Sequence, residues 1–570
     1  MTRTTSKKGF TALCAVLLGF VLLAPAAFGQ TTDQLTNPAA GDWPTYGRNL
    51  QMWRYSPLDQ INTDNVGTLR MAWSRGLSTV YENQGSPVEY GGVLYISGPD
   101  RVDALDATNG DLVWEHKVTL DKNTNSLTAQ RMRGSVVLYE GKVFWTTGDG
   151  RVVALDAKSG KEVWSTQVGA IQTGEGFSSG PIFADGKIIV GPSGADTGGN
   201  NGRVIAMDVN SGEILWTFHT VPQPGEPGFD TWQPPSAAQW GGASAWTPGA
   251  YDPASKTVIY GVGQPIPWGT IDNNGNTVRS GKNLYTDSWV ALDVNTGKLK
   301  WYHQIVPNGV WDGDEIPTPL IAPMTVGGQQ QNVALLATTQ GFLVEVDAAT
   351  GKWINAFQEA PKVSYLKGFQ ADGTPIIDDS YRFSKPGETK LICMFRWVDF
   401  EPAAYSPDTG FYYRPNNNDC NNMTDNPRPA DWKPGQNPIN YSFQGLPDMF
   451  DRVGAISAID PATGKVAWSF TSPYSQYSGP VVTKGNLVFF GNPDRHFRAL
   501  DAKTGKVLFD QILPAYVASN PISYEVNGKQ YVAIIDGGLG GIVIHHQKKV
   551  SDPVTGDVSV FVFALPSSGN

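Results

Sequence analysis

An eleven-residue pattern recurs along this chain and limits the folds that it can adopt. The pattern is Ala-x-Asp-x-x-(Thr/Ser)-Gly-x-x-x-Trp. Complete copies occupy residues 154–164, 206–216, 291–301 and 458–468. Looser copies occupy 104–114, 345–351 and 499–509, and residues 66–73 match the second half of an eighth. Regular repetition of one short unit is typical of folds that stack the same supersecondary element many times.

Each copy predicts a strand, a tight turn and a second strand. The Asp opens the turn, the Gly supplies the positive φ that the turn needs, and the Trp begins the next strand. Apolar runs before the copies, at 92–96, 141–145 and 186–190, predict one further strand each. Four-stranded units that repeat without amphipathic helices predict an all-β fold, an eight-bladed β-propeller. We expect residues 66–73 to close the ring against the C-terminal strand near 558–563.

Two intervals between repeats are longer than the others, with extra residues around 217–285 and 355–450. Insertions in a propeller gather on a face, where loops carry function. The first insertion leads to residues 311–315, which read Trp-Asp-Gly-Asp-Glu. Three carboxylates this close repel one another unless a cation or a reaction occupies them. The alternative is a solvated acidic loop, since Asp and Glu are mostly exposed.

The N-terminal residues have the order of a secretory leader. Basic residues at 3, 7 and 8 precede an apolar run at 10–23 and small residues at 27–29. This order predicts a signal peptide over 1–29 and a mature, periplasmic chain that begins near Gln30 and forms a single propeller domain over 30–570. No second long apolar run follows, so we expect no membrane anchor. The formal net charge of −10 argues against a nucleic-acid partner.

Only two cysteines remain beyond the leader, Cys393 and Cys420. In an oxidising compartment this pair predicts one disulfide, worth roughly 3 to 4 kcal/mol by the loop-entropy relation. Two separate buried thiols are the alternative. The sequence has no Cys-x-x-Cys-His, which excludes an attached c-type haem.

Motifs outside the repeat resemble a known family. They are Asp-Trp-Pro-Thr-Tyr-Gly-Arg at 42–48, Arg-Tyr-Ser-Pro-Leu-x-Gln-Ile-Asn at 54–62, Ala-Tyr-Ser-Pro-x-Thr-Gly at 404–410 and Gly-Lys-Gln-Tyr-Val-Ala at 528–533. Together with the repeat they resemble the pyrroloquinoline quinone (PQQ)-dependent alcohol dehydrogenases, which are eight-bladed quinoproteins, over nearly the whole mature chain. The resemblance implies oxidation of primary or secondary alcohols to aldehydes or ketones by hydride transfer to PQQ.

The resemblance assigns residues to a quinone site. Trp246 matches the tryptophan on which the planar quinone lies, and Arg133 matches an arginine that pairs with a quinone carboxylate. The other quinone contacts that it implies are Ser178, Ser244, Gln84, Thr339 and Asp399. The alternatives are that Trp246 is ordinary packing between blades and that Arg133 is a surface residue before a strand.

The resemblance also implies a cation beside the quinone. Its ligands map onto Asp196, Gln264, Asp312 and Asp314, which carry the oxygen donors that a hard cation needs. Asp196 replaces a Glu of the family, and Gln264 replaces an Asn. Asp314 stands where members that use lanthanides carry an additional carboxylate, which suits a trivalent ion by charge balance. Both calcium and a lanthanide remain open.

In the family pattern Asp312 is the general base. It takes the alcohol proton as hydride leaves the carbinol carbon, while the cation polarises the accepting carbonyl. The partners implied are a small-molecule alcohol and a separate soluble cytochrome c that accepts the electrons. The chain is expected to be a monomer or a homodimer.

The sequence also departs from the family. Leu127 and Thr128 stand where two adjacent cysteines often roof the quinone, and Thr339 stands where a basic residue is expected. Gln84 replaces a glutamate and Asp399 an asparagine. These departures leave a second hypothesis, a cofactor-free propeller that serves as a binding or assembly scaffold. Oxygen donors at all four cation positions favour the enzyme.

Overall fold

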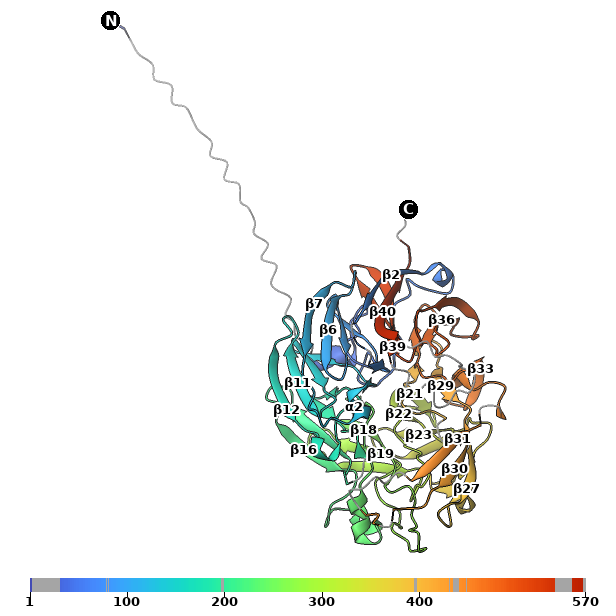
Figure 1. Ribbon diagram of the computed structural model, residues 1–570. Helices are drawn as coiled ribbons and strands as arrows, with labels where there is room; N and C mark the ends of the chain where they lie inside the picture. Colours follow the sequence, from blue (N-terminus) through green and yellow to red (C-terminus); the bar gives the residue numbers. More distant parts are fainter. Residues whose placement is uncertain are drawn as a thin grey trace.

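The computed structural model describes Met1, Thr2 and residues 31–77, 79, 81–195, 199–393, 397–429, 431–433, 440–446, 449–538 and 556–566. In these ranges the chain forms seven four-stranded sheets and one five-stranded sheet. The sheets follow one another round the molecule, from blue through green to red (Figure 1). This is the predicted all-β propeller, with one sheet for each blade. None of the helices in the described ranges has the length and apolar character of a membrane span.

The first four blades are antiparallel sheets of consecutive strands. They comprise β4 (Val88–Tyr90), β5 (Val93–Ser97), β6 (Arg101–Asp106) and β7 (Leu112–Lys117); β9 (Val137–Tyr139), β10 (Lys142–Thr146), β11 (Arg151–Asp156) and β12 (Glu162–Gln167); β13 (Ile182–Ala184), β14 (Lys187–Val190), β15 (Arg203–Asp208) and β16 (Ile214–His219); and β17 (Ala250–Asp252), β18 (Thr257–Val262), β19 (Ser288–Asp293) and β20 (Leu299–Gln304).

The next three blades continue the pattern. They comprise β21 (Leu320–Val326), β22 (Gln329–Ala337), β23 (Phe342–Asp347) and β24 (Trp353–Gln358); β28 (Ala404–Tyr405), β29 (Tyr412–Asn417), β32 (Gly454–Asp460) and β33 (Lys465–Ser472); and β34 (Val481–Thr483), β35 (Leu487–Gly491), β36 (His496–Asp501) and β37 (Val507–Ile512), with β1 (Tyr55–Ser56) added in parallel to β34.

The last blade joins the two ends of the propeller. Strands β38 (Ile522–Val526), β39 (Lys529–Gly538) and β40 (Gly556–Ala564) are completed by the early strand β2 (Arg70–Gly76). Trp73 of β2 lies opposite Val562 of β40, and Figure 1 shows the blue and red strands meeting. The predicted closure of the ring is therefore confirmed.

The repeat encodes contacts between neighbouring blades. The indole nitrogen of Trp164 donates to the Val209 carbonyl of the next blade over 3.2 Å. Gly212 has a φ of 71°, and a Cβ there would lie 2.6 Å from the Trp164 ring. The same packing joins Trp73 to Gly110, Trp114 to Gly160, Trp216 to Gly297, Trp301 to Gly351 and Trp468 to Gly505. One detail of the prediction was wrong: Trp164 is the third residue of β12, not its first.

The two insertions add structure beyond the blades. The first contains the 3₁₀ turns η4 (Phe229–Thr231) and η5 (Pro235–Trp240). The second contains the pair β25 (Leu366–Phe369) and β26 (Pro375–Ile377), the turn η6 (Asp379–Tyr381), and a sheet of β27 (Thr389–Cys393), β30 (Cys420–Asp425) and β31 (Tyr441–Gly445). Cys393 and Cys420 lie opposite each other in that sheet and form a disulfide, as predicted.

Short elements complete the described structure. They are α1 (Thr32–Thr36), η1 (Val66–Thr68), α2 (Ser126–Ala129), η2 (Ile171–Thr173), and the parallel pair β3 (Glu82–Asn83) and β8 (Arg131–Met132). The pair β3–β8 positions two residues of the expected quinone site, because Gln84 directly follows β3 and Arg133 directly follows β8.

Candidate functional site

Asp312 lies in the loop that joins blades four and five and is mostly buried. Its backbone is left-handed, with a φ of 55°. Residues other than glycine seldom adopt this conformation, although Asp is among those that tolerate it best. Such strained residues persist only where the surroundings hold them, and they cluster at functional sites. The loop around Asp312 therefore needs external support.

The second insertion supplies that support. The rings of Trp311 and Tyr365 stack with centroids 3.9 Å apart and planes 7° apart. The indole nitrogen of Trp311 also donates to the Tyr381 carbonyl over 3.1 Å. Gln340 Nε2 donates to the Gly313 carbonyl and to the Tyr365 hydroxyl, at 3.3 and 3.2 Å. Trp311 is thus held by the second insertion, and Gly313 is held by Gln340 in the turn between β22 and β23, which itself contacts Tyr365 of the insertion.

Three of the predicted cation ligands lie together beside the predicted quinone floor. Asp314 Oδ2 accepts a hydrogen bond from the indole nitrogen of Trp246 at 2.8 Å, and Asp314 Oδ1 accepts one from the Gln264 backbone nitrogen at 2.7 Å. The side-chain amide of Gln264 donates to Asp312 Oδ1 at 3.2 Å. A solvated acidic loop is excluded, because Asp312 is buried and these contacts hold it in the interior.

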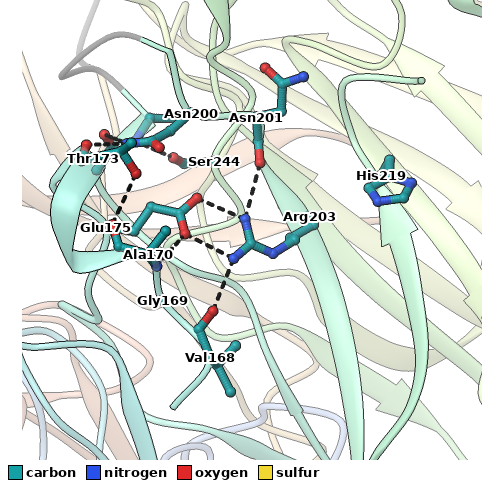
Figure 2. Close-up of polar contacts among 12 residues, drawn as sticks. Val168, Gly169, Ala170, Thr173, Glu175, Asn200, Asn201, Arg203, His219 and Ser244 are labelled. Carbon is teal, nitrogen blue, oxygen red and sulfur yellow. Dashed lines mark hydrogen bonds and ion pairs between the residues drawn. The ribbon is translucent and has the colours of Figure 1, made fainter. Parts of the chain in front are cut away.

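The fourth predicted ligand, Asp196, lies outside the described residues, but both flanks of its loop are anchored. Ala195 donates its backbone N–H to Ser244 Oγ at 3.2 Å, and Asn200 Nδ2 donates to the Gly194 carbonyl at 3.3 Å. Glu175, whose Cα would lie 3.2 Å from a Cβ added to Gly194, forms a two-point ion pair with Arg203, at 2.7 and 2.8 Å (Figure 2). A bidentate pair of this kind gives geometric specificity, so Glu175 is held in a defined position beside Gly194.

Arg133 lies over the face of Trp246. Its guanidinium carbon is 4.5 Å from the Trp246 ring centroid and 5.1 Å from that of Phe400. Arg133 Nε donates to Gln84 Oε1 at 2.8 Å, and Gln84 Nε2 donates to Glu82 Oε1 at 2.8 Å. Arg133 is therefore not an isolated surface residue. It forms a cationic group beside an aromatic face, the environment that a planar anion prefers.

Four predicted quinone contacts remain: Ser178, Ser244, Thr339 and Asp399. Ser178 accepts a backbone hydrogen bond from Arg133 through its carbonyl at 2.6 Å. The Ser244 carbonyl accepts from the Gly263 N–H at 2.9 Å. Thr339 Oγ1 donates to the Gly313 carbonyl at 3.3 Å, which places it beside the Asp312 loop. The Asp399 N–H donates to Glu401 Oε2 at 2.9 Å, and burial, followed by the charge of Asp399, raises the pKa of Glu401 to about 8, whereas Arg133 opposes this shift.

Sequence reasoning missed one buried carboxylate of the site, Asp287, and gave no separate role to another, Glu315, which it noted only as part of the acidic run 311–315. Both oxygens of Asp287 and Oε2 of Glu315 make no hydrogen bond among the described residues. Burial raises the pKa of Asp287 well above its ordinary value, the charge of Asp314 raises it further, and Arg279 opposes the shift. Burial and then the charge of Asp287 likewise raise the pKa of Glu315. Asp287 directly precedes an apolar strand, and nothing in the sequence around it indicates that its carboxylate would be buried.

The residues present fit the implied cofactors. The cation set is all oxygen, as a hard cation requires, and buried carboxylates without hydrogen-bond partners need positive charge nearby. Within the described ranges no three His, Cys, Asp or Glu side chains gather closely enough to hold a metal ion. The predicted set is consistent with this, since it uses an amide, Gln264, and a residue outside those ranges, Asp196. Trp246, with the Arg133 guanidinium over its ring, supplies the aromatic surface and the positive charge that a planar anionic quinone such as PQQ requires.

Comparisons with known proteins identify the family of this chain. Residues 43–365 and 473–532 match the family described as "PQQ: Glucose/ethanol/alcohol dehydrogenase, beta-propeller domain". The chain is 32% identical to the quinoprotein alcohol dehydrogenase PedH of Pseudomonas putida, over 99% of this chain and 98% of that protein. It is also 32% identical to the lanthanide-dependent methanol dehydrogenase of Methylacidiphilum fumariolicum, over 95% of this chain and 92% of that protein.

A solved structure supports the same assignment. The europium-containing methanol dehydrogenase superposes with a TM-score of 0.85 at 30% identity, over 94% of this chain and 100% of that one. Likeness that spans nearly the whole of both chains does not support a scaffold without a cofactor. The chain therefore belongs to the family of PQQ-dependent alcohol dehydrogenases and is an alcohol-oxidising quinoprotein that uses PQQ with Ca²⁺ or a lanthanide.

Proposed function

We propose that this chain is an exported dehydrogenase of primary or secondary alcohols in which Asp312 is the general base. The observation that carries the proposal is the hydrogen-bonded group of Asp312, Gln264, Asp314 and Trp246. It joins a strained, buried carboxylate to predicted cation ligands and to the aromatic floor. This arrangement matches what proton removal beside a polarised acceptor requires.

The chain's own residues have distinct tasks in this proposal. Asp312 accepts the hydroxyl proton of the alcohol, and Gln264 orients its carboxylate through Oδ1. Asp196, Gln264, Asp312 and Asp314 hold the cation, and Trp246 and Arg133 hold the quinone. When bound, PQQ supplies the two-electron oxidant, and the cation supplies Lewis-acid polarisation. Trp311 and Tyr365 keep the Asp312 loop in place.

The proposal extends to processing and electron transfer. The leader over 1–29 is removed, and residues 30–570 function in the periplasm as a single propeller domain, as a monomer or a homodimer. Electrons leave to a separate soluble cytochrome c. The order of basic, apolar and small residues at the N-terminus supports export, and the absence of Cys-x-x-Cys-His from the sequence supports an external haem carrier.

The test is reconstitution of purified mature protein with PQQ and either Ca²⁺ or a light lanthanide, followed by dye-linked oxidation of primary and secondary alcohols. We expect quinone absorbance to remain with the protein and turnover to appear with at least one ion. Reduction of purified cytochrome c, and an intact mass that places the mature N-terminus near Gln30, test the two extensions separately. Failure to retain quinone with either ion would contradict the proposed site.

A further inference from the structure

Asp287 is a buried carboxylate outside the predicted ligand set. It is 1% exposed, and neither carboxylate oxygen makes a hydrogen bond among the described residues. An isolated buried carboxylate is costly, and such groups are normally paired or lie near a metal. Asp287 therefore holds a proton, as its raised pKa indicates, unless a positive charge lies close to it.

The position of Asp287 couples it to the cation site. Its backbone N–H donates to the Gly263 carbonyl at 3.0 Å, and the Gln264 N–H donates to Asp314 Oδ1 at 2.7 Å. The Gly263 carbonyl and the Gln264 N–H belong to one peptide group, so a single peptide separates the Asp287 backbone from the Asp314 carboxylate. After burial, the charge of Asp314 is the largest influence on the pKa of Asp287, and Asp312 contributes as well.

The neighbouring arginine does not neutralise Asp287 by contact. All five hydrogen bonds of the buried Arg279 guanidinium go to uncharged oxygens: the carbonyls of Pro267 and Gly309 and the side chains of Asn283 and Asn308. Arg279 opposes the shift of the Asp287 pKa only at a distance. Asp287 packs against the backbone of Gly309, where a Cβ would overlap Oδ2. When Asp287 is ionised, a form that a bound cation favours, its charge therefore acts on the site through space and not by contact.

We propose that Asp287 is a specificity-determining residue whose charge favours a trivalent over a divalent cation at the site. The inference rests on the proposed cation site. Coulomb attraction grows with the charge of the ion, and salt screens a buried carboxylate much less than an exposed one. The third positive charge of a trivalent ion therefore adds more electrostatic binding free energy through Asp287 than it would through a carboxylate at the surface.

The test compares the binding of Tb³⁺ and Ca²⁺ in the mature full-length protein. Tb³⁺ binding is followed by luminescence sensitised through tryptophan, and Ca²⁺ binding by its displacement of Tb³⁺. The variants Asp287→Asn and Asp287→Ser remove the charge, and Asp287→Glu keeps it. We expect the ratio of the Ca²⁺ to the Tb³⁺ dissociation constant to fall by a factor on the order of ten in either neutral variant that folds, and to stay near the wild-type value in Asp287→Glu.

A matched control separates charge at the site from burial alone. Glu345 is also a buried carboxylate with an oxygen, Oε1, that makes no hydrogen bond among the described residues, but Asp460 is the charge that acts on it. Glu345→Gln should leave the Ca²⁺-to-Tb³⁺ ratio unchanged. An unchanged ratio in a folded neutral variant of Asp287 would overturn this inference alone. A wild-type protein that binds neither ion would overturn the proposed cation site and the inference with it.

Discussion

The indole nitrogen of Trp246 donates a hydrogen bond of 2.8 Å to Oδ2 of Asp314. The other oxygen of Asp314 accepts from the Gln264 backbone at 2.7 Å. The predicted aromatic floor of the quinone site and the predicted additional carboxylate of the cation site thus form one hydrogen-bonded unit. A substitution of Trp246 or of Asp314 should therefore alter both quinone binding and cation binding.

Trp246→Phe keeps an aromatic face and removes the indole donor. Hydrogen bonds to charged groups contribute about 1.5 to 3 kcal/mol, so we expect Tb³⁺ affinity to fall roughly tenfold or more, with a smaller loss of quinone affinity. Terbium luminescence and quinone absorbance measure the two effects. Trp43→Phe is the control, because Trp43 is fully buried and its indole nitrogen makes no hydrogen bond among the described residues. Equal losses in both variants would argue against the Trp246–Asp314 link.

Asp312→Asn keeps the size and the left-handed tolerance of the residue and removes the base. General acid–base groups contribute about 10²- to 10⁴-fold to rate, and we expect a loss of kcat in at least that range with the fold intact. Dye-linked turnover and a thermal melt measure activity and stability in the same preparation. Turnover at the wild-type rate would remove Asp312 from the mechanism.

Gly212→Ala tests the contact between blades. The φ of 71° strains any L-residue, and the new Cβ would also meet the Trp164 ring at 2.6 Å. Gly186→Ala is the matched control, because Gly186 has a φ of 75° with nothing within 4 Å of the added Cβ. Backbone strain costs about 1 to 2 kcal/mol in both variants, and overpacking adds about 1 to 3 kcal/mol in Gly212→Ala alone. Denaturant unfolding measures the loss of unfolding free energy in each variant. Equal losses would mean that the Trp164 ring moves aside without cost.

Removal of the Cys393–Cys420 disulfide should destabilise the second insertion. The cysteines are 27 residues apart in sequence, and crosslinks over loops of this length contribute about 3 to 4 kcal/mol. The double variant Cys393→Ser/Cys420→Ser should unfold at lower denaturant concentration than wild type, and reductant should have no further effect on it. A double variant that unfolds at the same denaturant concentration as wild type would contradict a stabilising bond.

Glu345→Gln should change how stability depends on pH. Burial, followed by the charge of Asp460, raises the pKa of Glu345 from its ordinary value of 4.5 to about 8. The folded state therefore holds a proton that the unfolded state releases between these values, and the free energy of unfolding falls as the pH rises through this window. The glutamine variant lacks this slope, so its stability relative to wild type should be greater at pH 8 than at pH 5. Denaturant unfolding at both pH values measures the change, and parallel curves would refute it.

Local chemistry explains why so much of the fold was predictable. Each repeat carries its own turn residues and its own inter-blade contact. The Asp, Gly and Trp of each copy, such as Asp208, Gly212 and Trp216, therefore predict one blade. The closure of β2 on β40 followed because residues 66–73 are a partial copy of the same unit. The disulfide followed because two cysteines allow one pairing.

The site was predictable only in part. Motif matching named Asp312, Asp314, Gln264 and Trp246, and the structure places them within hydrogen-bonding contact, although their roles remain predictions. The fourth ligand, Asp196, lies outside the described residues. The support of the Asp312 loop by Tyr365 and Gln340 carried no motif, because it depends on where the second insertion, which holds Tyr365, and the turn between β22 and β23, which holds Gln340, meet that loop.

The sequence by itself determined the repeating unit and the number of blades, because these depend on residue type and spacing within short segments, and its motifs named the candidate oxygen donors. Only the tertiary structure decided that Asp287 and Glu315 are buried beside Asp314 and that Trp246 binds a carboxylate 68 residues away. Burial and electrostatic coupling depend on which distant segments exclude water from a side chain. That information exists only once the blades have closed around their common centre.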